Sequence, residues 1–156
     1  MATTIVSAPG KVLLAGGYLV LDPAYSGLVV ATSSRFYCVV RPASPSTSSG
    51  ITVRAGQFPA ESSIWTYSLT PTDNGLEVSA NGEGRNKFVE ITLRNAVQVI
   101  VETVAAREGA TAGDAARKVL EGIDGGLEVI VLADNDFYSQ RDQVSPADDH
   151  KQAILD

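Results

Sequence analysis

The feature that most constrains the fold is a long amphipathic segment from Asn86 to Arg107. Its apolar side chains recur at spacings of three and four residues, as on one face of an α-helix. They are Val89, Leu93, Ala96, Val97, Ile100 and Val104. Gly109 follows the segment and predicts its end, and residues 111–120 predict a second, weaker helix. An apolar helix face of this length has to pack on a sheet or on another helix.

Short runs rich in β-branched and aromatic residues surround the helix and predict strands. They lie at residues 5–7, 12–15, 18–21, 28–31, 36–40, 51–54, 64–69 and 127–133. We expect sharp backbone features at Pro9-Gly10 and Gly16-Gly17, and a hairpin or meander turn at residues 32–34. The pair 51–54 and 64–69 alternates in polarity and predicts a half-exposed, peripheral part of the sheet. This order predicts an α+β fold with a mixed or antiparallel sheet and a long packed helix.

Composition and charge argue against one broad class of protein. The chain has 156 residues, of which 44% are hydrophobic and 19% charged, so it can form the core of one domain or of part of a larger one. Its formal net charge of −6 disfavours a nucleic-acid binder, because binding to phosphates needs positive charge. Residues 121–156 carry nine acidic and two basic side chains and predict a solvated acidic end.

Cysteine and histidine are each present once, as Cys38 and His150. The chain therefore has no internal disulfide and no zinc site of paired Cys or His ligands, which fits a reducing compartment. The alternation of Cys38 with apolar neighbours predicts a core position. Residues 1–8 lack the apolar core of a signal sequence, and the apolar stretch 12–21 is too short to cross a membrane. We therefore expect a cytoplasmic protein without a membrane segment.

Two short segments could bind phosphate or metal, but a structural interpretation is favoured for each. Residues 81–84 (Asn-Gly-Glu-Gly) match half of a dinucleotide-binding fingerprint, yet Lys87 stands where a glycine is required, so they predict a loop. Asp134 and Asp136 could hold Mg²⁺ beside a strand end. The sequence Asp-Asn-Asp is more typical of a turn, so we predict no metal site. A P-loop of the form Gly-x-x-x-x-Gly-Lys-Ser/Thr is absent.

The segment from Ser7 to Asp22 is the strongest candidate for a functional site. Pro9-Gly10 sets the backbone so that the Lys11 ammonium lies at the edge of a buried strand. Gly16-Gly17 then allows close backbone approach before the hydroxyl of Tyr18. A cation and a phenol at one cleft edge suit a phosphorylated substrate. The same residues also fit a structural interpretation, in which Lys11 extends from a strand end to solvent and Tyr18 packs in the core.

This segment resembles the first signature motif of the GHMP small-molecule kinases. Its continuation from residue 15 to 22, Ala-Gly-Gly-Tyr-Leu-Val-Leu-Asp, looks like the fungal members that act on 5-phosphomevalonate. Residues 86–90 (Asn-Lys-Phe-Val-Glu) and residues 127–140 continue the resemblance, so it extends in three blocks over most of residues 1–143. The resemblance implies the N-terminal α+β domain of the GHMP fold, here incomplete.

For the site, the resemblance implies that Lys11 is both catalytic and substrate-binding, because the matching lysine contacts the transferring phosphoryl region. Tyr18 matches an aromatic residue that lines the substrate pocket. Gly17 stands where many relatives have Glu, so no acidic role is implied there. The implied reaction transfers the γ-phosphoryl group of ATP, bound with Mg²⁺, to 5-phosphomevalonate. The product would be 5-diphosphomevalonate, in isoprenoid and, in a fungus, ergosterol synthesis.

The chain departs from the family at its nucleotide site. The second GHMP motif, Pro-x-x-x-Gly-Leu-Gly-Ser-Ser-Ala, would hold the ATP phosphates at a helix N-terminus and is absent, as is the third, glycine-rich motif. The nucleotide-binding residues are therefore unassigned. We expect an N-terminal fragment in which residues 1–143 form a partial domain with a polar loop at 42–50, and residues 144–156 form a disordered acidic tail. We expect this fragment alone to be inactive.

Two alternatives stay open. The chain could be another GHMP kinase such as mevalonate kinase, but Gly-Gly-Tyr at residues 16–18 argues against this, because Gly-Glu-His would be expected. It could also be a non-catalytic, truncated pseudo-kinase that binds a partner or the complementary part of the enzyme. In that case we expect an exposed apolar patch where the complementary elements would dock.

Overall fold

The computed structural model describes residues 2–43, 50–56, 58, 63–82, 84–123 and 125–137. The elements are β1 (Thr4–Ala15), η1 (Gly17–Leu21), β2 (Leu28–Pro42), β3 (Ile51–Ala55), β4 (Ile64–Thr72), β5 (Gly75–Asn81), α1 (Lys87–Glu108), α2 (Ala112–Gly122), β6 (Leu127–Ala133) and η3 (Asn135–Phe137), where η denotes a 3₁₀ helix. The strands form one sheet in the order β1-β2-β6-β3-β4-β5, in which only β3 and β6 are parallel neighbours. This confirms the predicted α+β fold with a mixed sheet. The predicted tail at 144–156 and most of the predicted loop at 42–50 lie outside the described residues.

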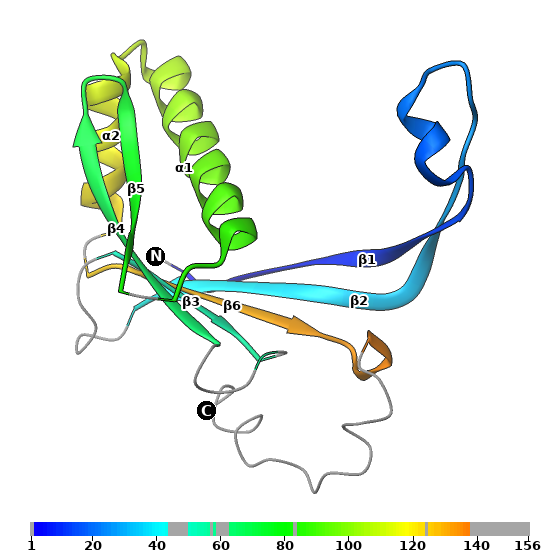
Figure 1. Cartoon of the computed structure of the whole chain (residues 1–156). Coiled ribbons are helices and arrows are strands. Elements are labelled where there is room, and N and C mark those ends of the chain that lie inside the picture. Colours follow the sequence, from blue (N-terminus) through cyan, green and yellow to red (C-terminus); the bar gives the residue numbers. More distant parts are fainter. Residues whose placement is uncertain are drawn as a thin grey trace, which may run out of the picture.

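The two helices cover only one end of the sheet. Both α1 and α2 stand beside β4 and β5, which curve up along them (Figure 1). At the other end, β1 and β2 extend away from the helices as a long hairpin and then bend toward the same side of the sheet as the helices (Figure 1). The far half of this hairpin therefore has no helix packed on it.

Local capping sets the ends of both helices. The side chain of Asn86 accepts hydrogen bonds from the backbone N–H groups of Phe88 and Val89, at 3.1 and 3.3 Å, and so caps the start of α1. Gly109 ends α1 in the left-handed conformation, with φ 63°. Thr111 caps α2 by accepting from the N–H of Asp114 at 3.1 Å. Both helices are confirmed close to their predicted bounds.

The hydrophobic core lies between α1 and the strands β3, β4 and β5. Its buried members are Ile51, Val53, Ala55, Trp65, Tyr67, Val78 and Val97. The prediction that the pair 51–54 and 64–69 is half-exposed and peripheral was therefore wrong for β3, which is buried, and for the place of both strands inside the sheet, whereas β4 does alternate between buried and exposed side chains at residues 64–67. The reason is β5, which the sequence did not predict: it pairs with β4 and, with α1, covers this pair of strands.

The buried face of α1 differs in part from the predicted one. Val97 and Val101 are buried, as is Glu90, and Val104 packs against the core. Ile100, which was predicted to be buried, has 48% of its surface exposed. The helix packs against both β5 and α2, and these contacts favour the side that carries Val101 over the side that carries Ile100.

The N-terminal hairpin is more continuous than its sequence indicated. Pro9-Gly10 makes no chain reversal; β1 runs through it with a shift in register between Pro9 and Lys11. Residues 28–40 form one strand rather than two strands with a turn at 32–34. Residues 18–21 belong to the 3₁₀ helix η1 rather than to a strand. β1 pairs with residues 28–31 and 35–40 of β2, and β6 pairs with residues 36–42. This pairing before and after residues 32–34 keeps β2 one strand despite the local turn signal.

A buried carboxylate joins the start of α1 to the segment before it. Glu90 is 5% exposed and lies 2.7 Å from the guanidinium nitrogens of both Arg85 and Arg94. The hydrogen bond from Arg85, together with the charges of Arg85 and Arg94, lowers the pKa of the Glu90 carboxyl below its ordinary value. The carboxylate is therefore ionised in the folded chain at neutral pH and compensates both arginines.

We predict that Glu90→Gln removes part of the acid sensitivity of the fold. Because the pKa of Glu90 is lower in the folded than in the unfolded chain, its stabilising contribution is present above the ordinary value of 4.5 and is lost as the pH falls through the folded-state value. The free-energy advantage of the wild type over the variant should therefore shrink in urea titrations as the pH falls below the ordinary value of 4.5. The control variant Glu102→Gln, at an exposed position of the same helix, should keep the wild-type pH dependence. A constant difference between wild type and Glu90→Gln would contradict this assignment.

Candidate functional site

The predicted site residues lie together on the outer part of the hairpin. We call residues 10–34 the arm: it comprises the outer halves of β1 and β2 and, at its tip, η1. Lys11 is in β1 opposite Ala31, and Tyr18 is in η1. The arm lies beyond the end of the sheet that the helices cover (Figure 1). The position of the site is therefore set by the hairpin.

Glycine at position 16 is required by the geometry of the arm. Gly16 has φ 110°, and a Cβ atom there would lie 2.4 Å from a methyl carbon of Val20 and 2.9 Å from the backbone of Gly27. No other residue fits without moving the backbone. This confirms the close backbone approach that the Gly16-Gly17 pair predicted, and it turns the chain from β1 into η1 before Tyr18.

Lys11 and Tyr18 are both exposed, and Tyr18 shows 93% of its surface. The structural interpretation in which Tyr18 packs in the core is therefore wrong. Among the described residues, neither side chain takes part in a hydrogen bond or an ion pair. Both polar groups are thus free to meet a ligand, and the fold does not depend on them.

Many apolar side chains of the arm are exposed. Those with more than a third of their surface exposed are Val12, Leu13, Leu14, Tyr18, Leu19, Val20, Leu21, Tyr25, Leu28, Val29 and Val30. A monomeric protein seldom leaves so many contiguous apolar residues in water. This exposed patch matches the one expected for a chain that binds complementary polypeptide.

The outer face of α1 adds a second apolar stripe. Phe88, Ile91 and Val99 are 85%, 57% and 59% exposed and lie on this face. Thr92 and Thr103 lie on the same stripe, and their hydroxyls donate to backbone carbonyls one turn earlier, at 2.8 and 2.6 Å. Because these hydroxyls are satisfied within the helix, the whole stripe is suited to burial.

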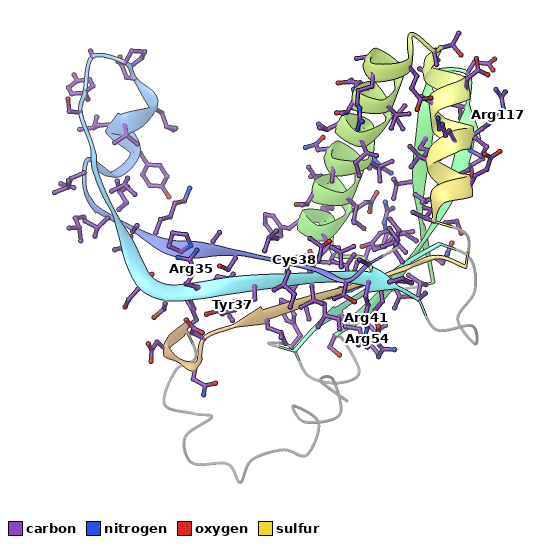
Figure 2. The ribbon with its side chains drawn as sticks, turned by 180° about the vertical axis from the view of Figure 1, so that it is seen from behind. Arg35, Tyr37, Cys38, Arg41, Arg54 and Arg117 are labelled. Atoms are coloured by element: carbon purple, nitrogen blue, oxygen red, sulfur yellow. The ribbon has the colours of Figure 1, made fainter. Side chains whose placement is uncertain are left out.

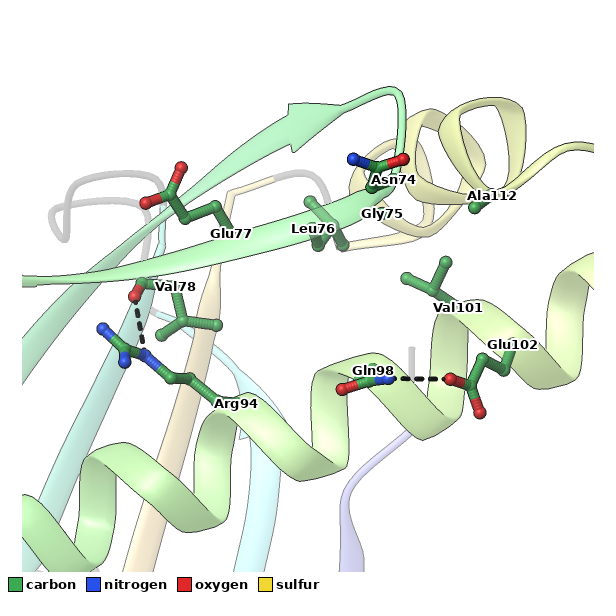
Figure 3. A pocket seen from close by; sticks show the side chains of 10 residues that line it. All are labelled: Asn74, Gly75, Leu76, Glu77, Val78, Arg94, Gln98, Val101, Glu102 and Ala112. Carbon is green, nitrogen blue, oxygen red and sulfur yellow. Dashed lines mark hydrogen bonds between the residues drawn. The ribbon is translucent and has the colours of Figure 1, made fainter.

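A cavity of about 440 Å³ lies elsewhere, between β5 and α1 (Figure 3). Three of its polar side chains, on α1, are paired: Arg94 donates to the carbonyl of Val78 at 3.3 Å, and Gln98 donates to Glu102 at 2.8 Å. Arg94 also pairs with Glu90. The bond from Arg94 to Val78 links α1 to the edge strand β5, and neither Lys11 nor Tyr18 lines the cavity.

The acidic turn at the end of β6 is committed to structure. A carboxylate oxygen of Asp134 accepts from the N–H of Arg35 at 2.8 Å, and one of Asp136 accepts from the hydroxyl of Ser34 at 3.0 Å. These bonds support the turn interpretation of residues 134–136. Over the described ranges, no three carboxylate, cysteine or histidine side chains come together as a metal site would require.

A charged cluster joins three strands through Glu128, a link that sequence reasoning missed. Arg41 of β2 and Arg54 of β3 each donate to one carboxylate oxygen of Glu128 on β6, at 2.7 and 2.6 Å. Figure 2 labels the two arginines. Burial by itself raises the pKa of Glu128, and the two hydrogen bonds more than offset it, so the net pKa is lowered. The partners are 87 and 74 residues away in sequence, so no local pattern could reveal them.

Cys38 lies half-buried in the middle of β2. It sits opposite Val6 of β1 and Val131 of β6. Burial raises the pKa of its thiol above the ordinary value, so the reactive thiolate is disfavoured at neutral pH. These observations support the predicted packing role rather than a catalytic one.

We predict that Lys11→Ala and Tyr18→Ala each change the free energy of unfolding by less than about 0.5 kcal/mol, because neither side chain supports the fold. Tyr67→Ala, at a core position with 2% exposure, should cost about 3–5 kcal/mol. Urea denaturation followed by circular dichroism measures both. A loss above about 1 kcal/mol for Tyr18→Ala would indicate a structural role instead.

The chain is similar over most of its length to known phosphomevalonate kinases. It is 33% identical over 154 residues to the peroxisomal phosphomevalonate kinase of Arabidopsis thaliana. The matched region covers 92% of this chain and 28% of that enzyme. It is 31% identical to a phosphomevalonate kinase of Aspergillus fumigatus, over 89% of this chain and 32% of that enzyme. It is 34% identical to the phosphomevalonate kinase of Candida albicans, over 87% of this chain and 26% of that enzyme.

No family model matches the chain. None of the helices in the described parts has the length and apolar character needed to traverse a bilayer. The chain spans less than a third of the length of the phosphomevalonate kinases named above. It is therefore similar to one part of enzymes that are much longer.

Proposed function

We propose that this chain carries the substrate side of a phosphomevalonate kinase of the GHMP type, which transfers the γ-phosphoryl group of ATP to 5-phosphomevalonate. The observation that carries the proposal is the similarity to three phosphomevalonate kinases over about nine-tenths of the chain. The exposed, unpaired Lys11 and Tyr18 on the arm are consistent with it. A cytoplasmic location and a place in isoprenoid synthesis are part of the same proposal.

In this function Lys11 supplies positive charge and Tyr18 a hydroxyl. The ammonium of Lys11 would pair with the phosphate of 5-phosphomevalonate and stabilise the charge that develops during transfer. The hydroxyl of Tyr18 would donate to the substrate and fix its position. Both groups act by holding the substrate in place, which is the main source of rate in phosphoryl transfer.

The described residues do not fit a site for Mg²⁺-bound ATP. Gly82 and Gly84 precede α1, but the backbone N–H groups of Phe88 and Val89 at its start are already bonded to the side chain of Asn86. Asp134 and Asp136 are bonded to β2. We therefore assign no nucleotide-binding residue and derive no step through ATP.

A chimera tests the proposed function directly. The matched region of the Candida albicans enzyme is replaced by this chain, and ADP release is measured with 5-phosphomevalonate. We expect turnover in the chimera and none from the 156-residue chain alone. Lys11→Met should lower kcat/KM by about 100-fold or more, because it removes a charge that faces the transferring group. Tyr18→Phe should act mainly on KM, by about tenfold, because it removes one hydrogen bond to substrate.

The matched control is Lys118→Met in the same chimera. Lys118 is on α2, is paired with Glu108 and lies far from the arm, so its loss should leave kcat/KM unchanged. A folded, active chimera that tolerates Lys11→Met would contradict the assigned role of Lys11. Equal turnover with mevalonate would favour the alternative kinase instead. Ordinary kinase turnover by the 156-residue chain alone would refute the expectation that it is inactive.

The exposed apolar surface favours a second candidate function, the binding of complementary polypeptide. The relatives are more than three times as long as the region that this chain matches, so we propose that the remainder of such an enzyme is what covers the arm and the outer face of α1. Burial of these side chains would remove the apolar residues from water. This candidate needs no catalytic role for the chain on its own.

We predict that the isolated chain binds the dye ANS and associates at raised concentration, because its apolar arm is exposed. Addition of the remainder of the Candida albicans enzyme as a separate polypeptide should suppress both. Leu19→Ser with Leu21→Ser, two exposed arm positions, should weaken this complex, and Ile100→Ser, on α1 but off its apolar stripe, serves as the control. A stable monomer that binds neither dye nor the added polypeptide would exclude this candidate.

A further inference from the structure

The bend between the arm and the sheet has an unusual pairing. On one side of it Pro9 pairs with Arg35, and on the other side Lys11 pairs with Ala31. One residue of β1, Gly10, therefore faces three residues of β2, at positions 32–34. Extra residues on one strand of an antiparallel pair bend it locally, and the hairpin bends at this point (Figure 1).

The ring of Phe137 lies against Gly10 at this bend. A Cβ atom at Gly10 would lie 2.4 Å from a ring carbon of Phe137 and 2.7 Å from the hydroxyl of Thr32, so only glycine fits there. Gly10 is the one buried residue of β1. The Phe137 ring also packs on Phe36, with 4.5 Å between ring centres. A residue of η3 thus lies against both strands of the hairpin at the bend.

Two carboxylates of the same turn bind β2 at one end of this register change, at Ser34 and Arg35. Asp134 accepts from the N–H of Arg35 at 2.8 Å, and its own N–H donates to the carbonyl of Arg35 at 2.9 Å. Asp136 accepts from the hydroxyl of Ser34 at 3.0 Å. The turn itself is closed by a bond from the N–H of Phe137 to the carbonyl of Asp134, at 3.1 Å.

We propose that Asp134, Asp136 and Phe137 are positioning residues that set the angle of the arm relative to the sheet. They contact the hairpin at the bend. Lys11 follows Gly10 directly, and Tyr18 lies further out on the arm. A change at the bend therefore moves both. The effect of this movement on turnover rests on the proposed kinase function. The control of the arm angle does not rest on it.

A spin-label distance measurement tests the angle without any assay of activity. Labels are attached at Ala24→Cys on the arm and Asn95→Cys on α1, in a Cys38→Ser background. We expect a single narrow distance distribution. Phe137→Ala should broaden it by about twofold, because the arm then samples a range of angles. Phe58→Ala is the matched control, because its partly exposed ring packs on Trp65 away from the bend.

The aspartates provide a test by conservative rescue. Asp134→Ala removes the acceptor for Arg35 N–H and should broaden the distribution, whereas Asp134→Asn keeps an oxygen acceptor and should leave it narrow. If Phe137→Ala fails to fold, Gly10→Ala replaces it in the test. The added methyl group displaces the Phe137 ring and should broaden the distance distribution in the same way. Narrow, unshifted distributions in folded Phe137→Ala and Asp134→Ala would overturn the proposal.

The chimera then separates this proposal from the proposed function. Asp134→Ala should lower kcat/KM by about tenfold, because misplacement of positioned groups slows transfer. The double variant Asp134→Asn with Asp136→Asn should leave turnover nearly intact. Broadened distances in a chimera that never turns over would refute the kinase function but leave the positioning role standing. Broadened distances with full turnover would refute the catalytic relevance of the arm angle.

Discussion

The structure depends on the packing of one helix face against three strands. Val97 of α1 lies in one buried cluster with Val53 of β3 and Tyr67 of β4, and these side chains have little or no exposed surface. Burial of such residues is the main source of stability in a chain of this size. The buried Glu90, held between two arginines, keeps the start of α1 in place over this cluster. The other elements extend from it.

Burial is distributed very unevenly about this core. The end of the sheet formed by β3, β4 and β5 is covered, whereas the arm and the outer stripe of α1 are apolar and exposed. Such a surface is costly in water. The similarity to enzymes more than three times as long offers a physical reason for this exposure. In a longer chain, further polypeptide can pack on the exposed apolar surface. The same uncovered arm carries the two groups that we assign to substrate binding.

Lys11 and Tyr18 could be proposed from the sequence because they lie in one short segment. The Pro-Gly-Lys and Gly-Gly-Tyr elements lie within 16 residues, and their resemblance to a kinase motif can be read directly from the sequence. The context of the pair could not be predicted in the same way. The exposure of Tyr18 depends on what packs against the arm, and the bend that carries both residues depends on Phe137, more than 100 residues later.

The sequence by itself determined the features that local chemistry controls. Asn86 and Gly109 delimit α1, and the crowding at Gly16 is confirmed, because capping and positive φ act within a few residues. Tertiary structure alone decided the rest: β5 as a strand, the burial of β3 and β4, and the exposure of Ile100. Each of these depends on partners distant in sequence, and the pattern of a strand or helix does not show which of its faces will be covered.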